Sequence, residues 1–223
     1  QAGEPLAIRI AGVAGNPVNA RSQISQALTA AGVTNATVNV DDVAIIRPQG
    51  CSALDTFGKV RRTGDRSLSV SQREFEMQTQ PPGSPYPVAS QAVITVRAPA
   101  GQEFSIFGIE PEGLFSVLVN NRAELDALVA RDREASPAER LVEAVGENEY
   151  RIKPLMDHTG WSGLVMLTGE GPFDPAITQP EPGARGEAWQ GDFVATASER
   201  DWKSEMLWFK SVDKQPNEAP AAG

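Results

Sequence analysis

The feature that most constrains this chain is an apolar run of eight residues, WSGLVMLT, at positions 161–168. Gly160 precedes the run and Gly169 follows it, and glycine often marks the ends of a strand. A strand this apolar must be covered on at least one face, and we expect cover on both. The run therefore predicts a central core strand, within a hairpin that spans residues 150–173.

The same segment holds side chains that suggest catalysis. Asp157 adjoins His158, which is the only histidine of the chain, and Ser162 follows closely. A serine nucleophile needs a base, and that base needs an acid that orients it. Neighbouring residues point in different directions, and GWSGL lacks the glycine two positions after the serine that a nucleophile elbow requires. We therefore predict that the protein is not an enzyme; the alternative is a hydrolase that uses His158 with Asp157 and Ser162 or Cys51.

The distribution of proline divides the chain into two predicted units of an α+β fold. Residues 79–87, TQPPGSPYP, contain four prolines in nine positions, which can continue neither a helix nor a central strand. We predict a linker there. Residues 1–78 are predicted to form a small α/β domain, with a strand at 6–13 and a helix that starts at Asn19. Residues 88–214 are predicted to form an antiparallel β-rich domain with peripheral helices, followed by a disordered tail at 215–223.

Several local signals organise the second predicted domain. Asn121, with Glu124 three residues later, predicts the start of a helix. The segment Ser-Pro-Ala-Glu at 136–139 predicts another, which would continue through Val145. Residues 192–197 are predicted to be extended. Residues 171–186 are rich in proline and glycine and predict a long surface loop.

Charge and composition exclude several classes of ligand. The net charge is −9, which opposes binding to a phosphate backbone, so we expect no nucleic-acid partner. With one cysteine, one histidine and no calcium-loop spacing, the sequence predicts neither a metal site nor a cofactor. No apolar run approaches the roughly 20 residues that span a bilayer, so we expect no membrane insertion of this region.

Aromatic residues concentrate in the last third of the chain and are the candidate binding residues. They could line a groove or form an interface hot spot, and the alternative is that they pack in the core. Residues 101–223 carry 22 acidic and 11 basic side chains, whereas residues 1–100 carry 7 and 9, so an exposed subset would favour a basic or amphipathic partner. The candidates are Trp161, Phe173, Trp189, Trp202 and Trp208, with Phe209 in the same cluster.

Three stretches carry a resemblance to a known group of proteins. The pattern GCSALD before a basic helix and the strand SLSVS, together with GWSGLVMLTGEGPF and DWKSEMLWF, resembles regions outside the catalytic domain of bacterial transmembrane Ser/Thr protein kinases and related exported proteins. No glycine-rich loop, HRD or DFG signature of a kinase occurs here. The resemblance implies no site residues.

The resemblance and the lack of catalytic motifs together predict the function. The resemblance implies a non-enzymatic, extracytoplasmic or periplasmic sensing or protein-interaction module, which fits an anchor segment upstream of Gln1. The expected partner is a protein or a cell-envelope ligand. A purely structural envelope component is the other alternative.

Overall fold

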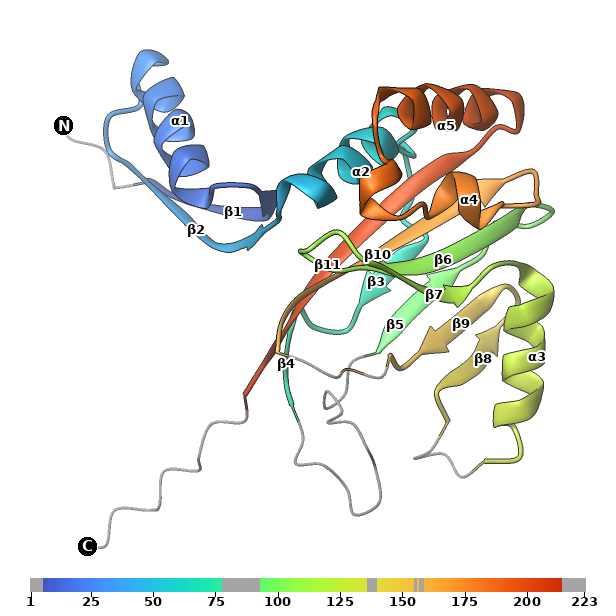
Figure 1. Cartoon of the computed structure of the whole chain (residues 1–223). Coiled ribbons are helices and arrows are strands. Elements are labelled where there is room, and N and C mark those ends of the chain that lie inside the picture. Colours follow the sequence, from blue (N-terminus) through green and yellow to red (C-terminus); the bar gives the residue numbers. More distant parts are fainter. Residues whose placement is uncertain (1–5, 78–92, 136–139, 155, 157–158, 214–223) are drawn as a thin grey trace, which may run out of the picture.

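The computed structural model describes residues 6–77, 93–135, 140–154, 156 and 159–213. Its helices and strands form an α+β fold, as predicted (Figure 1). The predicted linker at 79–87, the tail at 215–223, Asp157 and His158 lie outside the described residues.

The first unit of the fold is a strand–helix–strand motif, which we call the arm. Strand β1 (Leu6–Ala14) pairs in parallel with β2 (Ala36–Ile45), and α1 (Pro17–Ala30) connects them. The arm projects to one side of the other sheets (Figure 1). Helix α1 begins one turn earlier than predicted, because the Asn16 side chain accepts a hydrogen bond from the Asn19 amide and Pro17 occupies the first turn.

Two larger sheets form the body of the protein. The five-stranded sheet has the order β4-β11-β10-β6-β7, and the four-stranded sheet has the order β3-β5-β9-β8. The five strands are β4 (Glu74–Glu76), β11 (Lys203–Val212), β10 (Gly160–Gly169), β6 (Glu103–Ile109) and β7 (Phe115–Val119). The four strands are β3 (Leu68–Val70), β5 (Ile94–Arg97), β9 (Glu149–Ile152) and β8 (Val142–Gly146).

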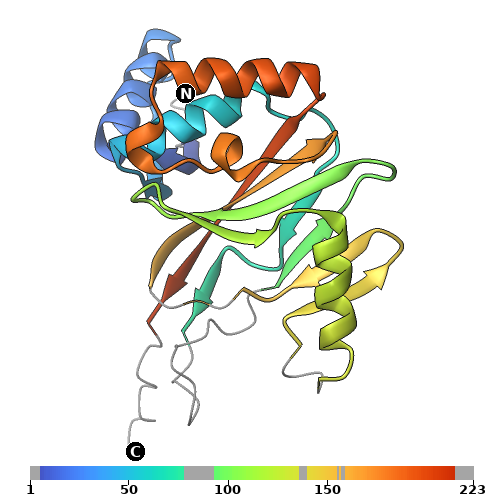
Figure 2. The ribbon, with the colours of Figure 1, turned by 45° about the vertical axis from the view of Figure 1, so that its right-hand side comes forward.

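Helices complete the layers of the body. Helices α2 and α5 lie over one face of the five-stranded sheet, and the four-stranded sheet lies on its other side (Figure 2). Within the described residues of the body, the helices and a 3₁₀ turn are α2 (Pro48–Lys59), α3 (Arg122–Asp132), α4 (Pro175–Thr178), η1 (Pro182–Ala184) and α5 (Glu187–Glu199). Helix α3 contributes Leu125 and Val129 to the core between the two sheets. The five-stranded sheet is therefore the middle layer.

Strand β10 confirms the prediction of a central strand covered on both faces. Leu164 and Met166 face the core between the two sheets, whereas Val165 and Leu167 face the core beneath the helices. All four side chains are at least 97% buried. This double cover is the reason that the run lacks the polar alternation of a half-exposed strand.

Three local predictions were wrong. The hairpin predicted over residues 150–173 does not form, because β9 pairs with β5 and β8 in the four-stranded sheet, whereas β10 pairs with β6 and β11 in the five-stranded sheet. Residues 192–197 lie within α5 and are not extended, because Trp189, Phe193 and Ala197 recur every four residues and form the buried face of a helix. The helix predicted to run through Val145 is replaced by β8, which pairs with β9. Tertiary pairing outweighed the local signal there.

The predicted boundary near residue 78 does not coincide with a break in sheet pairing. Strand β3 pairs with β5, and β4 pairs with β11, so two short strands that precede the proline-rich segment belong to sheets that follow it. Each has only three residues, too few to form a sheet of their own. Among the described strands, only those of the arm lie outside the two large sheets.

Candidate recognition cleft

Three of the five predicted binding residues are core residues. Phe173, Trp189 and Trp202 belong to the core beneath the helices and are 4%, 8% and 1% exposed. The indole N–H of Trp189 donates to the Ile177 carbonyl at 2.7 Å, and that of Trp202 donates to the Glu170 carbonyl at 2.8 Å. Both indole N–H groups are therefore hydrogen-bonded within the protein. All three side chains pack in the core and are not exposed for a partner to bind. Phe209 is also buried, in the other core.

Trp161 and Trp208 differ from the other aromatic residues. Both are half-buried and lie on the neighbouring strands β10 and β11. Their side chains are on the face of the five-stranded sheet that α2 and α5 cover. Trp208 pairs with Gly163, where an added Cβ would lie 2.9 Å from the indole ring. Glycine therefore leaves the space in which the Trp208 ring rests on β10.

The residues of the alternative hydrolase are not brought together. Ser162 faces the core between the sheets, and its buried hydroxyl has no hydrogen-bond partner among the described residues. Cys51 lies on α2 and packs against the core on the opposite face of the same sheet. The sheet separates these two side chains, and Asp157 and His158 lie outside the part of the chain that the structure describes.

A cleft of about 370 Å³ lies between the arm and the outer side of β11. Trp161 and Trp208 line it, so the two half-buried tryptophans open into the same space. The arm contributes Ala11, Gly12, Val13 and Asp42, and the body contributes Arg61, Arg62, Gly64, Asp65, Arg66, Arg73, Trp161 and residues 204–208.

The base of the arm is attached to the body at one corner. The Arg47 amide donates to the Pro111 carbonyl at 2.9 Å, and Val13 packs against the core beneath the helices. Gly113, with φ +86°, lies so close to the start of α2 that an added Cβ would be 2.8 Å from the Gly50 nitrogen. These contacts set the position of one wall of the cleft.

Three arginines at the cleft are exposed and carry no ion pair with any described residue. They are Arg61, Arg66 and Arg73. Arg62 is partly buried and donates to the Ser67 hydroxyl at 2.9 Å. This cluster concentrates positive charge on a protein whose net charge is −9.

Two of the acidic groups at the cleft are already engaged. The Glu205 carboxylate accepts the backbone amides of Ser67 at 2.7 Å and Leu68 at 3.1 Å. Asp42 is bound by Arg9, and the hydrogen bond from that guanidinium lowers the pKa of Asp42, with smaller contributions from the charges of Arg73 and Lys210. Only Asp65 is exposed without such a partner among the described residues.

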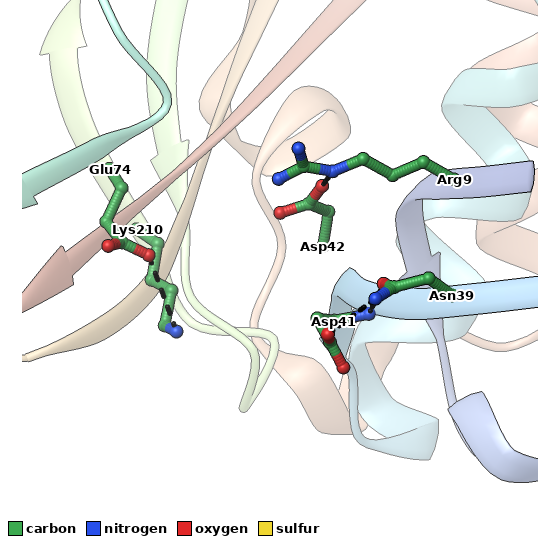
Figure 3. A network of polar contacts seen from close by, with 6 residues as sticks. All are labelled: Arg9, Asn39, Asp41, Asp42, Glu74 and Lys210. Atoms are coloured by element: carbon green, nitrogen blue, oxygen red, sulfur yellow. Dashed lines mark hydrogen bonds and ion pairs between the residues drawn. The ribbon is translucent and has the colours of Figure 1, made fainter. Parts of the chain in front are cut away.

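Figure 3 shows the two sides of this charged region. The Arg9–Asp42 pair projects from the arm. Lys210 lies opposite on β11, where its Nζ is 3.7 Å from Oε2 of Glu74. The sequence analysis did not identify these arginines as candidate binding residues. The run from Arg61 to Arg66, RRTGDR, was the available signal.

Comparisons with known proteins assign no family to this fold. No protein-family model matches the chain, and neither a curated protein nor a solved structure shows significant similarity to it. Within the described residues, no helix is both long and apolar enough to cross a membrane. The same residues contain no group of three His, Cys, Asp or Glu side chains that could hold a metal ion.

Proposed function

We propose that this protein is a non-enzymatic recognition module that binds an acidic segment of a partner protein in the cleft beside the arm. The observation that carries the proposal is the combination of Trp161 and Trp208 with three exposed arginines that form no ion pair with a described carboxylate. The local charge favours an acidic ligand, opposite in sign to the ligand that the net charge of −9 favours.

The chemistry of these side chains suits carboxylate groups on a peptide. Arginine binds a carboxylate through two parallel hydrogen bonds, and indole rings supply apolar contact area at a small cost in conformational entropy. The cleft volume of about 370 Å³ lies at the lower end of the range typical of small-ligand pockets. It therefore suits a few residues of an extended peptide rather than a folded domain.

The proposal includes an extracytoplasmic location in a bacterial envelope or signalling protein. This part is supported by the resemblance of residues such as 160–173 to the non-catalytic regions of transmembrane kinases. Protease accessibility of the native protein in intact spheroplasts tests it. Protection from protease until the spheroplasts are lysed would overturn the location without affecting the cleft.

Fluorescence anisotropy with a labelled peptide of alternating glutamate and valine tests peptide recognition. We expect saturable binding that weakens as salt is raised, because exposed charges are screened. Replacing Arg61, Arg66 and Arg73 together by glutamine should lower the affinity about tenfold or more, since each exposed pair contributes about 0.5 kcal/mol. Arg133→Gln, an exposed arginine at the end of α3, is the matched control and should leave the affinity unchanged.

Three outcomes would overturn the proposed function. The first is the absence of binding by the acidic peptide. The second is equal binding of a peptide in which lysine replaces glutamate. The third is tighter binding of a single-stranded oligonucleotide of the same charge, since that would assign the arginines to phosphate groups.

A further inference from the structure

The outer edge of β11 is hydrogen-bonded at two places within and beside the cleft. At one end, the Ser204 amide donates to the Val60 carbonyl at 2.9 Å, and the Arg62 amide donates to the Ser204 carbonyl at 2.8 Å. At the other end, the Lys210 amide donates to the Arg73 carbonyl at 2.7 Å. Both ends of this edge are therefore paired.

Between these two places the edge is open. Alternate residues of a strand direct their N–H and C=O groups to the same side, so Met206 and Trp208 direct theirs to the same edge as Ser204 and Lys210. Strand β11 pairs with β10 without a register shift, which preserves this alternation. Among the described residues, no backbone or side-chain group bonds to this side of Met206 or Trp208. We call residues 206–208 the open edge.

The path of the chain explains the open edge. The segment that ends at Arg62 pairs with the edge of β11, and the segment that starts at Arg73 pairs with it again. Between Arg62 and Arg73 the chain crosses to the other sheet, where β3 pairs with β5. The residues that could otherwise pair with the open edge therefore pair with β5 instead. The seven residues from Ser204 to Lys210 span about 20 Å of strand, which leaves room beside the open edge for a strand segment of about three residues.

The open edge coincides with the cleft. Met206 and Trp208 line the cleft, and so do Arg61, Arg66 and Arg73, the arginines without an ion pair among the described residues. Unpaired backbone donors and acceptors therefore lie beside unpaired cations. An extended peptide with acidic side chains has both kinds of partner.

We propose that an acidic segment of a partner protein binds as an added β-strand, through main-chain hydrogen bonds to Met206 and Trp208. The inference rests on the proposed function and specifies its binding mode. Main-chain bonds supply affinity, and the arginines select carboxylate side chains. The paired segments on both sides of the gap run parallel to β11, so a parallel added strand would make the edge continuous.

Amide hydrogen exchange, measured by NMR on the whole chain, tests this binding mode. In the free protein we expect fast exchange of the Met206 and Trp208 amides, because neither has a hydrogen-bond partner among the described residues. Saturation with the glutamate–valine peptide should slow both by about tenfold or more, as expected when an exposed amide enters a ladder. Leu207, which pairs with Leu164 inside the sheet, is the internal control and should not change.

Two methylated peptides provide a second readout. Methylation of alternate backbone nitrogens on one edge of the peptide removes the donors that face β11, and methylation of the other set leaves them in place. We expect the peptide methylated on the nitrogens that face β11 to bind about two- to tenfold more weakly, as for the loss of a hydrogen bond. The peptide methylated on the other nitrogens should bind like the unmodified peptide.

The outcomes separate this inference from the proposed function. Arginine-dependent binding without protection of Met206 and Trp208, or with equal affinity of both methylated peptides, would overturn the added strand and leave the recognition cleft in place. Absence of any peptide binding would overturn both. Protection of the two amides that rises with protein concentration in the absence of peptide would assign the open edge to a second copy of the chain, and would also overturn the inference.

Discussion

The indole ring of Trp208 lies over Gly163 on the neighbouring strand, in space that any other residue would fill. An added Cβ at Gly163 would be 2.9 Å from the Trp208 ring and 2.6 Å from the Ile109 side chain. Contacts this short force a side chain to shift. This pair links the centre of the core strand β10 to the wall of the cleft.

Gly163→Ala should therefore displace Trp208 and destabilise the protein by about 1–3 kcal/mol, the usual cost of overpacking. Chemical denaturation measures the loss, and near-ultraviolet circular dichroism reports the altered indole. Gly58→Ala is the matched control, because nothing lies within 4 Å of a Cβ at Gly58 and alanine favours a helix. Equal stability of the two variants would contradict the close packing.

The tryptophans should separate into two classes when each is replaced by alanine. Trp202 is 1% exposed in the core beneath the helices, so Trp202→Ala should cost about 3–5 kcal/mol. Trp161 is half-buried at the cleft, so Trp161→Ala should cost about 1 kcal/mol and weaken binding of the acidic peptide. Thermal denaturation and anisotropy measure the two effects. A larger loss of stability for Trp161→Ala would contradict this division.

Asp132 should make stability depend on pH. Burial opposes its charge, yet the backbone amides of Val142 and Leu141 and the guanidinium of Arg131 outweigh burial and lower the pKa of Asp132. Because the folded pKa is below the unfolded value, this stabilisation is complete above the ordinary pKa of about 3.9 and is lost as the pH falls through the folded pKa.

Asp132→Asn should cost about 1–3 kcal/mol near neutral pH, because one amide oxygen cannot replace both carboxylate oxygens. The difference from the natural protein should shrink as the pH falls below about 4. Denaturation curves between neutral and acidic pH measure it, with Asp55→Asn, at an exposed position of α2, as the control. A difference that stays constant down to low pH would refute the role of the charge.

The arm should open more readily than the body. Helix α1 has no buried residue, and the arm's sheet has only two strands, whereas β10 is covered on both faces. Local stability follows the burial of apolar contacts, so amides of α1 should exchange faster than those of β10. Hydrogen exchange followed by mass spectrometry measures both segments in one sample. Equal protection would show that the arm and the body open together.

Local sequence signals correctly predicted an element whose own residues stabilise its first turn. The helix that starts after Asn121 was predicted from its capping residues and forms as α3, with the Asn121 side chain bonded to the Glu124 amide. The prediction of an extended segment at 192–197 failed because the helical spacing of Trp189, Phe193 and Ala197 extends beyond the short window that suggested a strand.

The sequence by itself determined that residues 161–168 form a strand covered on both faces, because eight apolar residues cannot remain in water. It did not determine which tryptophans face the cleft, since all four are equally apolar. Only the tertiary structure decided that: Trp189 and Trp202 lie beneath the helices, whereas Trp161 and Trp208 lie where the arm faces β11. The cleft and its open edge depend on contacts between residues far apart in the chain, which local periodicity does not encode.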